Sequence, residues 1–314
     1  MSDVINNNRQ KKIVSWVGML LIAVSLVFIV NRFLEADLDF AILASPQVIA
    51  GLVAISFAYS IVFIATAVNY RAWIYNVSGF KIPYPPAISI YCSANLYKYI
   101  PGSVLTIVGR NRLAVEYSGL SHGKVAFSTL LEGSFFVVAV IITTLVFSFE
   151  YAADGISQIN FSPIVTAIII GILVVVALII FLTRRRIGKF FKDIGEIGTL
   201  KPLALAKRFI TALLLATAWG STFLLILVLM GQPMDVRLAL TVIGLFNLSW
   251  LVGFAIPIAP AGLGIREAAT FVLFGGVVDE GFLLLAIMAH RVIAITSDVM
   301  AYCIAICYAR VKKE

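Results

Sequence analysis

Two arginines stand inside otherwise apolar sequence, and each follows an Ile-Pro pair by nine residues and precedes a glycine by nine. A guanidinium stays charged at physiological pH and offers a planar fork of donors that suits two phosphate oxygens. The spacing therefore predicts an internal repeat whose arginines contact an anionic head group, with Arg266 the first choice and Arg110 the second. One ungapped offset of 156 residues relates the two copies, which consist of Ile100, Pro101, Arg110 and Gly119, and of Ile256, Pro257, Arg266 and Gly275.

A structural role is the competing interpretation for both arginines. A charge at the centre of a membrane helix costs about 2.5–3.5 kcal/mol on insertion scales, so it needs a partner, water or a ligand. Arg266 could pair with Glu267 or a nearby carbonyl group and hold a turn. Arg110 could do the same, or could anchor the chain at the cytoplasmic edge of a membrane. Both interpretations stay open on sequence grounds.

Further charged residues in apolar segments are Glu132, Glu267, Arg291 and Asp298. Glu132 follows the first copy of the repeat and Arg291 follows the second, which predicts an ion pair between the copies. We expect such a pair to be structural or gating, because removing one partner would leave a buried charge. Asp298 comes seven residues after Arg291 on nearly the same helix face, where a structural hydrogen bond is favoured over proton coupling.

Helix breakers accompany both copies, and irregular backbone in a membrane is tolerated only where it is buried in protein or lines a cavity. We expect half-helices to begin at Pro101-Gly102-Ser103 and at Pro260-Ala261-Gly262, with partial positive charge at their amino termini. The candidate head-group contacts in these segments are Gly102, Ser103, Gly262 and Gly264. The candidate structural or gating residues are Pro101, Pro257 and Pro260, together with the charged residues Glu132, Glu267, Arg291 and Asp298.

The composition places these residues in a bilayer. Of the 314 residues, 61% are hydrophobic and 13% are charged, compared with about 25% charged in ordinary globular proteins. The net charge is +8, but the basic residues are not interleaved with aromatic residues in the way that nucleic-acid surfaces use, so nucleic acid is not an expected partner. The sequence has no HExxH motif, and we expect no catalytic residue, metal site or cofactor, although a membrane-embedded enzyme stays a weaker alternative.

Hydropathy and charge predict an all-α polytopic membrane protein with six crossings and two re-entrant helical hairpins. The hairpins are 87–108, flanked by basic residues on both sides, and 238–278, which begins and ends near acidic residues. With this topology 20 of the 24 basic residues lie on one side and two on the other, which identifies the cytoplasm and places both termini there. The six crossings are 13–30, 48–74, 125–149, 164–182, 209–230 and 282–308.

The repeat and the topology together predict one integral membrane domain over 1–314 that contains inverted repeats. The first unit, 48–149, holds a hairpin that enters from inside, and the second unit, 209–308, holds one that enters from outside. In transporters this architecture brings discontinuous helices to the middle of the membrane. We expect the protein to lie in the plasma (inner) membrane.

Two motifs resemble a known family. They are Lys98-Tyr99-Ile100-Pro101-Gly102 with Gly109-Arg110 behind it, and Pro260-Ala261-Gly262-Leu263-Gly264-Ile265-Arg266-Glu267. Both look like signatures of the lysylphosphatidylglycerol synthase transmembrane region, a flippase-like membrane domain, and the resemblance covers nearly the whole chain. It implies a stand-alone member without the synthase domain that moves or binds a lipid between leaflets. The implied substrate is an anionic phospholipid, an aminoacyl-phospholipid or a polyprenyl-linked glycolipid.

Other functions stay open beside lipid movement. The basic stretch 184–208 is compatible with a membrane subunit or scaffold for a lipid- or glycan-modifying enzyme, although such stretches more often bind anionic head groups. A lipid transferase is the weaker possibility. Membrane lipids are therefore the expected partners, with a modifying enzyme as the alternative.

Overall fold

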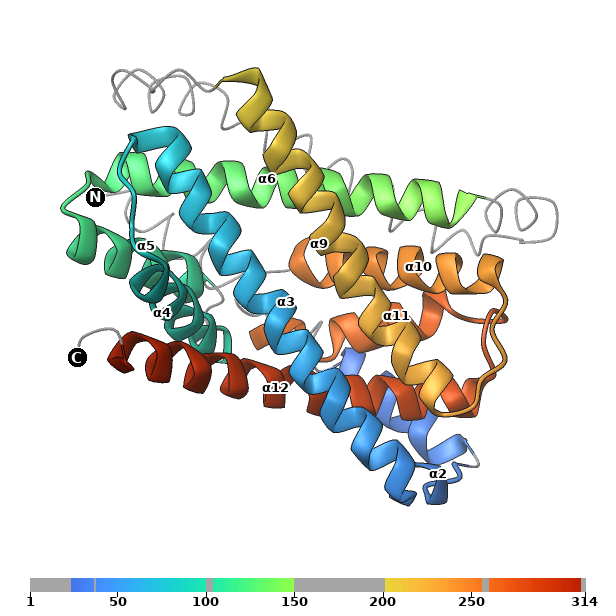
Figure 1. Ribbon diagram of the computed structural model, residues 1–314. Coiled ribbons are helices and arrows are strands. Elements are labelled where there is room, and N and C mark those ends of the chain that lie inside the picture. The colour runs from blue at the N-terminus through green and yellow to red at the C-terminus, as the bar shows by residue number, and fades with distance from the viewer. Residues whose placement is uncertain (1–23, 37, 100–103, 150–200, 256–259, 312–314) are drawn as a thin grey trace, which may run out of the picture.

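The computed structural model describes residues 24–36, 38–99, 104–149, 201–255 and 260–311, and these are helical with short connections. No strand occurs in these ranges. Figure 1 shows the arrangement. The elements in chain order are α2 (Ala41–Ala44), α3 (Pro46–Ser78), α4 (Tyr84–Asn95), η1 (Leu96–Tyr99), α5 (Val104–Ser118), α6 (His122–Phe147), α9 (Pro202–Leu229), α10 (Val236–Ala255), η2 (Pro260–Gly262), α11 (Ile265–Leu273) and α12 (Glu280–Val311).

Five helices, α3, α6, α9, α10 and α12, are long and apolar enough to cross a membrane. They are apolar around their whole circumference and leave large hydrophobic side chains exposed, which is typical of a membrane span. Their boundaries carry ordinary capping signals. The Ser45 hydroxyl accepts a hydrogen bond from the Val48 amide at the start of α3, and Gly79 ends that helix at a φ of 73°.

Four of the six predicted crossings coincide with α3, α6, α9 and α12. The crossing predicted at 164–182 lies outside the described residues. The crossing predicted at 13–30 lies mostly outside them, although residues 24–35 are helical. The fifth long helix, α10, was predicted as the first arm of a hairpin, and its 20 residues span about 30 Å, the thickness of a bilayer core.

Both predicted hairpins are broken helices. The first consists of α4 with 12 residues, the turn η1 and α5 with 15 residues. The second consists of α10, the turn η2 and α11 with nine residues. At about 1.5 Å per residue, α4, α5 and α11 are all too short to cross a bilayer core. The second hairpin therefore differs from the first in having one arm of full length.

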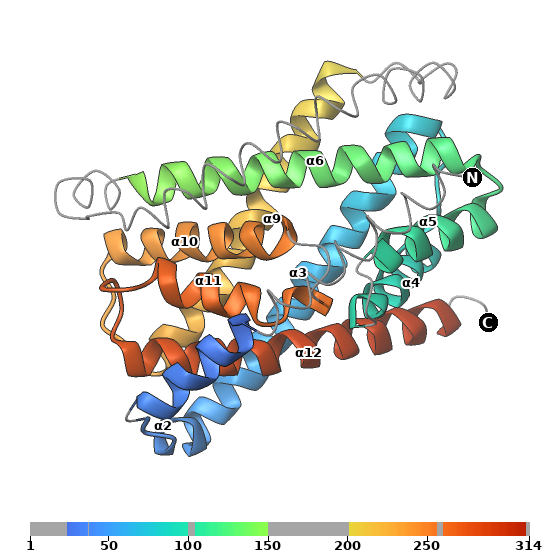
Figure 2. The ribbon, with the colours of Figure 1, turned by 180° about the vertical axis from the view of Figure 1, so that it is seen from behind.

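The predicted units contain their elements in the same order, since each has a long helix, a broken hairpin and another long helix. Figures 1 and 2 show α4 and α5 at one end of the bundle and α10 with α11 toward the other. The turns η1 and η2 contact each other inside the protein. The hairpins thus approach the centre from opposite ends, and their entry from opposite faces of a membrane stays a prediction.

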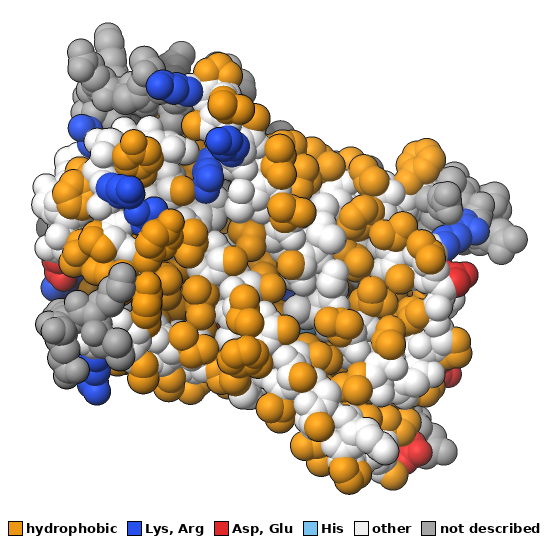
Figure 3. All heavy atoms as spheres, in the orientation of Figure 1, with side chains coloured by type: hydrophobic (Ala, Val, Ile, Leu, Met, Phe, Trp, Pro, Cys, Tyr) orange, Lys and Arg blue, Asp and Glu red, His pale blue; other side chains and the backbone are white. Residues whose placement is uncertain are grey.

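Charged side chains are distributed unevenly along the long axis. In Figure 3, hydrophobic side chains cover the middle of the visible face, most Lys and Arg side chains lie toward the end with α5 and the start of α9, and acidic ones lie mainly at the opposite end. The exposed residues include Arg112 and Lys201 at the first end and Asp235 and Asp279 at the second. The hydrophobic middle is what a bilayer core would cover.

Polar contacts fix α6, α9 and α10 to one another. The Asn247 side-chain amide of α10 donates to the Thr143 hydroxyl of α6 at 3.0 Å and to the Ala216 carbonyl of α9 at 3.1 Å. Gly220 of α9 allows this approach, because a Cβ there would lie 2.8 Å from the Ile243 carbonyl oxygen. Small residues with buried polar groups are the usual means of packing helices in membranes.

Candidate functional site

The second hairpin turns on residues with positive φ. Ala261, Gly262 and Gly264 have φ values of 51°, 70° and 82°. In the repeat, Val104 corresponds to Pro260. Helix α5 begins directly at Val104, whereas the turn η2 begins at Pro260 and helix α11 begins five residues later, at Ile265. The irregular backbone thus shortens the second half-helix and places Arg266 in its first turn.

Two glycines make room for the Arg266 side chain. A Cβ on Gly253 would lie 3.1 Å from the Arg266 Cβ, and a Cβ on Gly262 would lie 3.7 Å from it. The first distance is tighter than an ordinary contact, so the turn from α10 to α11 favours a residue without a side chain at Gly253, whereas the second distance is an ordinary van der Waals contact. Gly262 is favoured instead by its φ of 70°, which residues with a side chain rarely adopt.

The Arg266 guanidinium packs on an aromatic ring and keeps free donors. Its Cζ lies 4.7 Å from the centroid of the Phe246 ring, and the Tyr59 hydroxyl lies against the guanidinium. The Nε and Nη2 atoms are buried and have no hydrogen-bond partner in the described part of the chain. A buried donor without a partner costs about 1–3 kcal/mol, and more when it is charged, so a ligand or a water molecule that accepts from these two groups would remove that cost.

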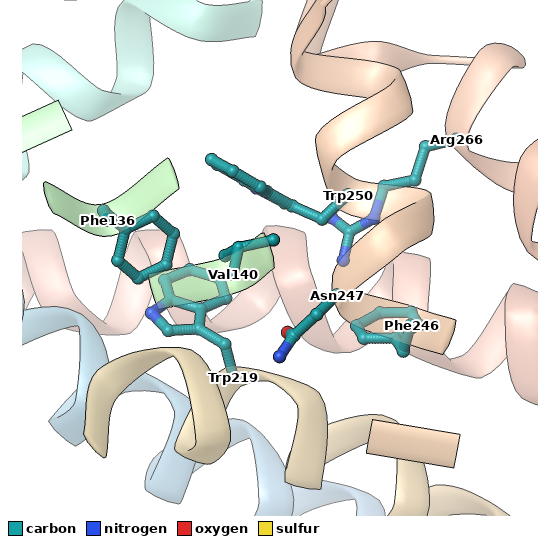
Figure 4. Close-up of a pocket in the computed structure, with 7 residues that line it drawn as sticks. All are labelled: Phe136, Val140, Trp219, Phe246, Asn247, Trp250 and Arg266. Carbon is teal, nitrogen blue, oxygen red and sulfur yellow. The ribbon is translucent and has the colours of Figure 1, made fainter. Parts of the chain in front are cut away.

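Figure 4 shows the recess into which Arg266 points. Its walls come from α6, α9 and α10, and are mostly aromatic. The Trp219 indole Nε1 is buried here and also has no hydrogen-bond partner within the described ranges. The recess is thus an apolar enclosure with a few donors, and the residues that line it are Phe136, Val140, Trp219, Phe246, Asn247, Trp250 and Arg266.

A second recess shares Phe246 and Arg266 with the first. Glu267, Thr270 and His290 line it among apolar side chains. The His290 Nε2 atom is buried, and no described residue supplies it with a hydrogen bond. Arg266 therefore stands between two small spaces that both contain unpartnered polar atoms.

Glu267 and Arg291 hold the turn beside Arg266. One Glu267 oxygen accepts a hydrogen bond from the Gly264 amide at 2.7 Å, and the other lies 3.3 Å from an Arg291 nitrogen. That same nitrogen donates to the Ala261 carbonyl at 3.3 Å. The two contacts that the structural interpretation assigned to Arg266, an ion pair with Glu267 and a bond to a hairpin carbonyl, thus belong to Arg291.

Arg110 is paired. Its guanidinium lies 3.0 Å from Glu132, and its Cζ lies 4.5 Å from the Tyr70 ring and 4.7 Å from the Tyr91 ring. With side-chain exposures of 11% and 7%, Arg110 and Glu132 are both buried inside the protein. The first arginine is thus neutralised inside the first unit.

The predicted ion pair between Glu132 and Arg291 is wrong. Each residue pairs within its own unit, Glu132 with Arg110 and Arg291 with Glu267. The physical reason is proximity: α6 packs against its own hairpin arm α5, and α12 packs against α11, so each charge meets a partner in its own unit first. The two repeat arginines consequently differ, since Arg110 is paired with a carboxylate and Arg266 has no such pair among the described residues.

Asp298 accepts hydrogen bonds from the tip of the first hairpin. Its carboxylate receives the Asn95 amide at 2.7 Å, the Tyr99 hydroxyl at 2.5 Å and the Lys98 ammonium at 2.6 Å. Lys98 and Tyr99 belong to the first motif, but sequence reasoning assigned neither of them to Asp298 and missed this cluster. Their spacing from Asn95, three and four residues, was the available signal, since it places all three on one side of a helical turn.

Some predicted residues lie outside the described ranges. These are Pro101, Gly102, Ser103 and Pro257, so their proposed roles stay predictions. Pro260 begins η2, and Gly262 and Gly264 lie in the turn next to Arg266. Sequence reasoning also missed the aromatic lining, because Trp219 and Trp250 do not stand out in a chain with 12% aromatic residues. No group of His, Cys, Asp and Glu able to hold a metal ion occurs among the described residues.

Comparison with known proteins identifies the same family that the two motifs resemble. No curated protein matches the chain. A family model described as the lysylphosphatidylglycerol synthase TM region matches residues 15–298, which include both hairpins, Arg110, Arg266 and Asp298. This match extends over far more than half of the 314 residues. The chain belongs to the family of the lysylphosphatidylglycerol synthase transmembrane region.

Proposed function

We propose that the protein binds the anionic head group of a membrane lipid at Arg266 and moves that lipid between leaflets. The observation that carries the proposal is the Arg266 guanidinium, two of whose buried donors have no hydrogen-bond partner among the residues that the structure describes. The lipid would be an anionic phospholipid, an aminoacyl-phospholipid or a polyprenyl-linked glycolipid. Membership of a family named for a lipid synthase supports lipid as the ligand class.

The charge balance around Arg266 favours an anion. Glu267 offsets Arg291, so Arg266 leaves one positive charge in the turn. The amino terminus of α11 adds roughly half a positive charge at the same place. A cation in the first turn of a helix is unfavourable by itself, and a bound phosphate would remove that penalty by accepting from the free guanidinium donors.

The surroundings of Arg266 fit a lipid whose chains stay in the bilayer. The hydrophobic exterior of the long helices would face acyl chains, while the recess would exclude bulk water from the head group. Excluding water strengthens the interaction between a guanidinium and a phosphate. Because Phe136 and Trp250 close the recess with rings 5.1 Å apart, a head group would enter when α6 and α10 separate there.

A leaflet assay tests the proposal. Purified protein is reconstituted in vesicles with a trace of anionic phospholipid labelled on its acyl chain, and dithionite bleaches the label in the outer leaflet. We expect wild type to move the lipid faster than protein-free vesicles, and Arg266→Gln to slow movement by about 10- to 100-fold. That range corresponds to the loss of a charge-assisted hydrogen bond of about 1.5–3 kcal/mol.

The matched control is Arg112→Gln. Arg112 lies on the first hairpin with 75% of its side chain exposed and pairs only with Glu116 at the surface. Removing its charge should leave the rate unchanged. A wild-type rate equal to that of empty vesicles, or equal rates for wild type and Arg266→Gln, would defeat the proposal. Loss of a lipid-modifying enzyme's activity in cells without intrinsic lipid movement would favour the scaffold instead.

A further inference from the structure

The tip of the first hairpin carries a cation that the account of Arg266 does not use. Lys98 in η1 places its ammonium 2.6 Å from Asp298 on α12. The lysine side chain is 25% exposed, whereas the aspartate side chain is 1% exposed. The carboxylate is therefore buried in the protein, while the lysine is partly exposed.

Asp298 does not depend on Lys98 for its hydrogen bonds. Asn95 donates to one carboxylate oxygen and the Tyr99 hydroxyl donates to the other. If Lys98 swung away, each oxygen would keep a donor, which limits the cost of leaving the carboxylate charged. Glu132 in the first unit differs, because it already has one buried oxygen without a hydrogen-bond partner in the described residues.

The side chain of Lys98 is suited to such a movement. An ammonium on a flexible four-carbon stem can change partners by rotating its own side chain, whereas a guanidinium pair needs its planar geometry. The Lys98 nitrogen also lies 5.9 Å from the Phe63 ring and 5.4 Å from the Tyr99 ring. These faces attract a cation weakly and leave its donors available to an anion.

Helix α12 brings the two hairpin tips together. Asp298 binds the tip of the first hairpin, and Arg291, seven residues earlier, binds the Ala261 carbonyl at the tip of the second. Seven residues correspond to about 10.5 Å along a helix. The turns η1 and η2 contact each other, so Lys98 in η1 lies next to the turn that precedes Arg266. Lys98 and Arg266 thus converge on one region from opposite hairpins.

We propose that Lys98 is a second binding residue for the anionic head group, which it takes in exchange for Asp298. The ligand chemistry is a phosphate group, and the inference rests on the proposed function of Arg266. In this arrangement Asp298 competes with the ligand for the lysine. The exchange leaves Lys98 paired with an anion whether the head group is present or absent.

The test measures ligand binding by purified full-length protein in detergent micelles, read from tryptophan emission because Trp219 and Trp250 line the recess. The probes are a short-chain phosphatidylglycerol, inorganic phosphate and a short-chain diacylglycerol without phosphate. We expect Lys98→Gln to weaken phosphatidylglycerol binding by about 10- to 100-fold. We expect Asp298→Asn to tighten it by about threefold or more, because the competing partner of Lys98 is weakened.

A double variant separates binding from structure. Lys98→Gln with Asp298→Asn removes both charges and keeps neutral side chains of similar size, so we expect it to unfold at the same temperature as wild type but bind as weakly as Lys98→Gln. If Lys98 were only structural, Asp298→Asn would weaken binding and the double variant would restore it. Either of these results overturns the role of Lys98. Lys207→Gln, which removes an exposed charge on α9, serves as the control.

The outcomes distinguish this inference from the proposed function. If Arg266→Gln abolishes binding while Lys98→Gln leaves it unchanged, the role of Lys98 falls and Arg266 stands. If neither variant affects binding, both fall. If Lys98-dependent binding is stronger for phosphatidylglycerol than for inorganic phosphate, the ligand is a lipid head group. If it is stronger for inorganic phosphate, the exchange stands with free phosphate as the ligand. Equal binding of diacylglycerol would contradict both.

Discussion

Breaking the buried pair between Arg110 and Glu132 should destabilise the protein strongly. Glu132→Gln would leave the Arg110 charge in a site where only 11% of its side chain is exposed. Removing one partner of a buried pair typically costs about 3–5 kcal/mol. The rings of Tyr70 and Tyr91 lie within 4.7 Å of the guanidinium carbon and stabilise the remaining charge, so we expect a loss near the lower value, about 3 kcal/mol.

Reversible unfolding in mixed micelles, titrated with a denaturing detergent, measures this loss. The control is Glu116→Gln, which breaks a pair whose side chains are 53% and 75% exposed and should cost less than about 1 kcal/mol. The double change Arg110→Met with Glu132→Leu removes both charges and should recover most of the stability. If Glu132→Gln proves as stable as Glu116→Gln, the pair does not have the structural role that its geometry implies.

Three further predictions concern the second hairpin and the topology. Gly253→Ala should displace the Arg266 stem, because the new Cβ would lie 3.1 Å from the arginine Cβ. It should weaken phosphatidylglycerol binding by about tenfold while the far-ultraviolet circular dichroism spectrum stays unchanged. Unchanged binding would show that Arg266 is not held there. Arg291→Met removes the tie to the Ala261 carbonyl and should slow lipid movement more than it lowers thermal stability, and the opposite order would make Arg291 purely structural. In a background without native cysteines, Lys207→Cys should react with an impermeant thiol reagent only from the cytoplasmic side and Asp235→Cys only from the outside, and labelling from the reverse sides would overturn the predicted orientation.

The sequence pattern predicted the places where the helices break, because proline and glycine act locally. Val104 and Ile265 begin the second arms close to the predicted positions, and η2 begins at the predicted Pro260. The length of α10 was not predictable in the same way. Its apolar residues fit a hairpin arm and a full crossing equally well, and only packing against α6 and α9 separates the two.

The partners of the charged residues could not be predicted, because hydropathy gives neither helix rotation nor depth. Glu132 and Arg291 occupy comparable places in the two units, so a pair between them was reasonable, yet each has a nearer partner on its own hairpin. Lys98 was missed for a related reason. A lysine beside tyrosines at the end of an apolar run is typical of a membrane interface, and only tertiary structure shows that it reaches Asp298.

The central claim is that Arg266 holds a lipid phosphate, and the most direct test is a distance measurement by solid-state nuclear magnetic resonance. Protein with ¹⁵N-labelled arginine is reconstituted with phosphatidylglycerol, and dipolar coupling between guanidinium nitrogen and lipid phosphorus is recorded. We predict a coupling of hydrogen-bonding range in wild type and in Arg112→Gln that is absent in Arg266→Gln. No such coupling in wild type, or the same coupling in Arg266→Gln, would contradict the claim.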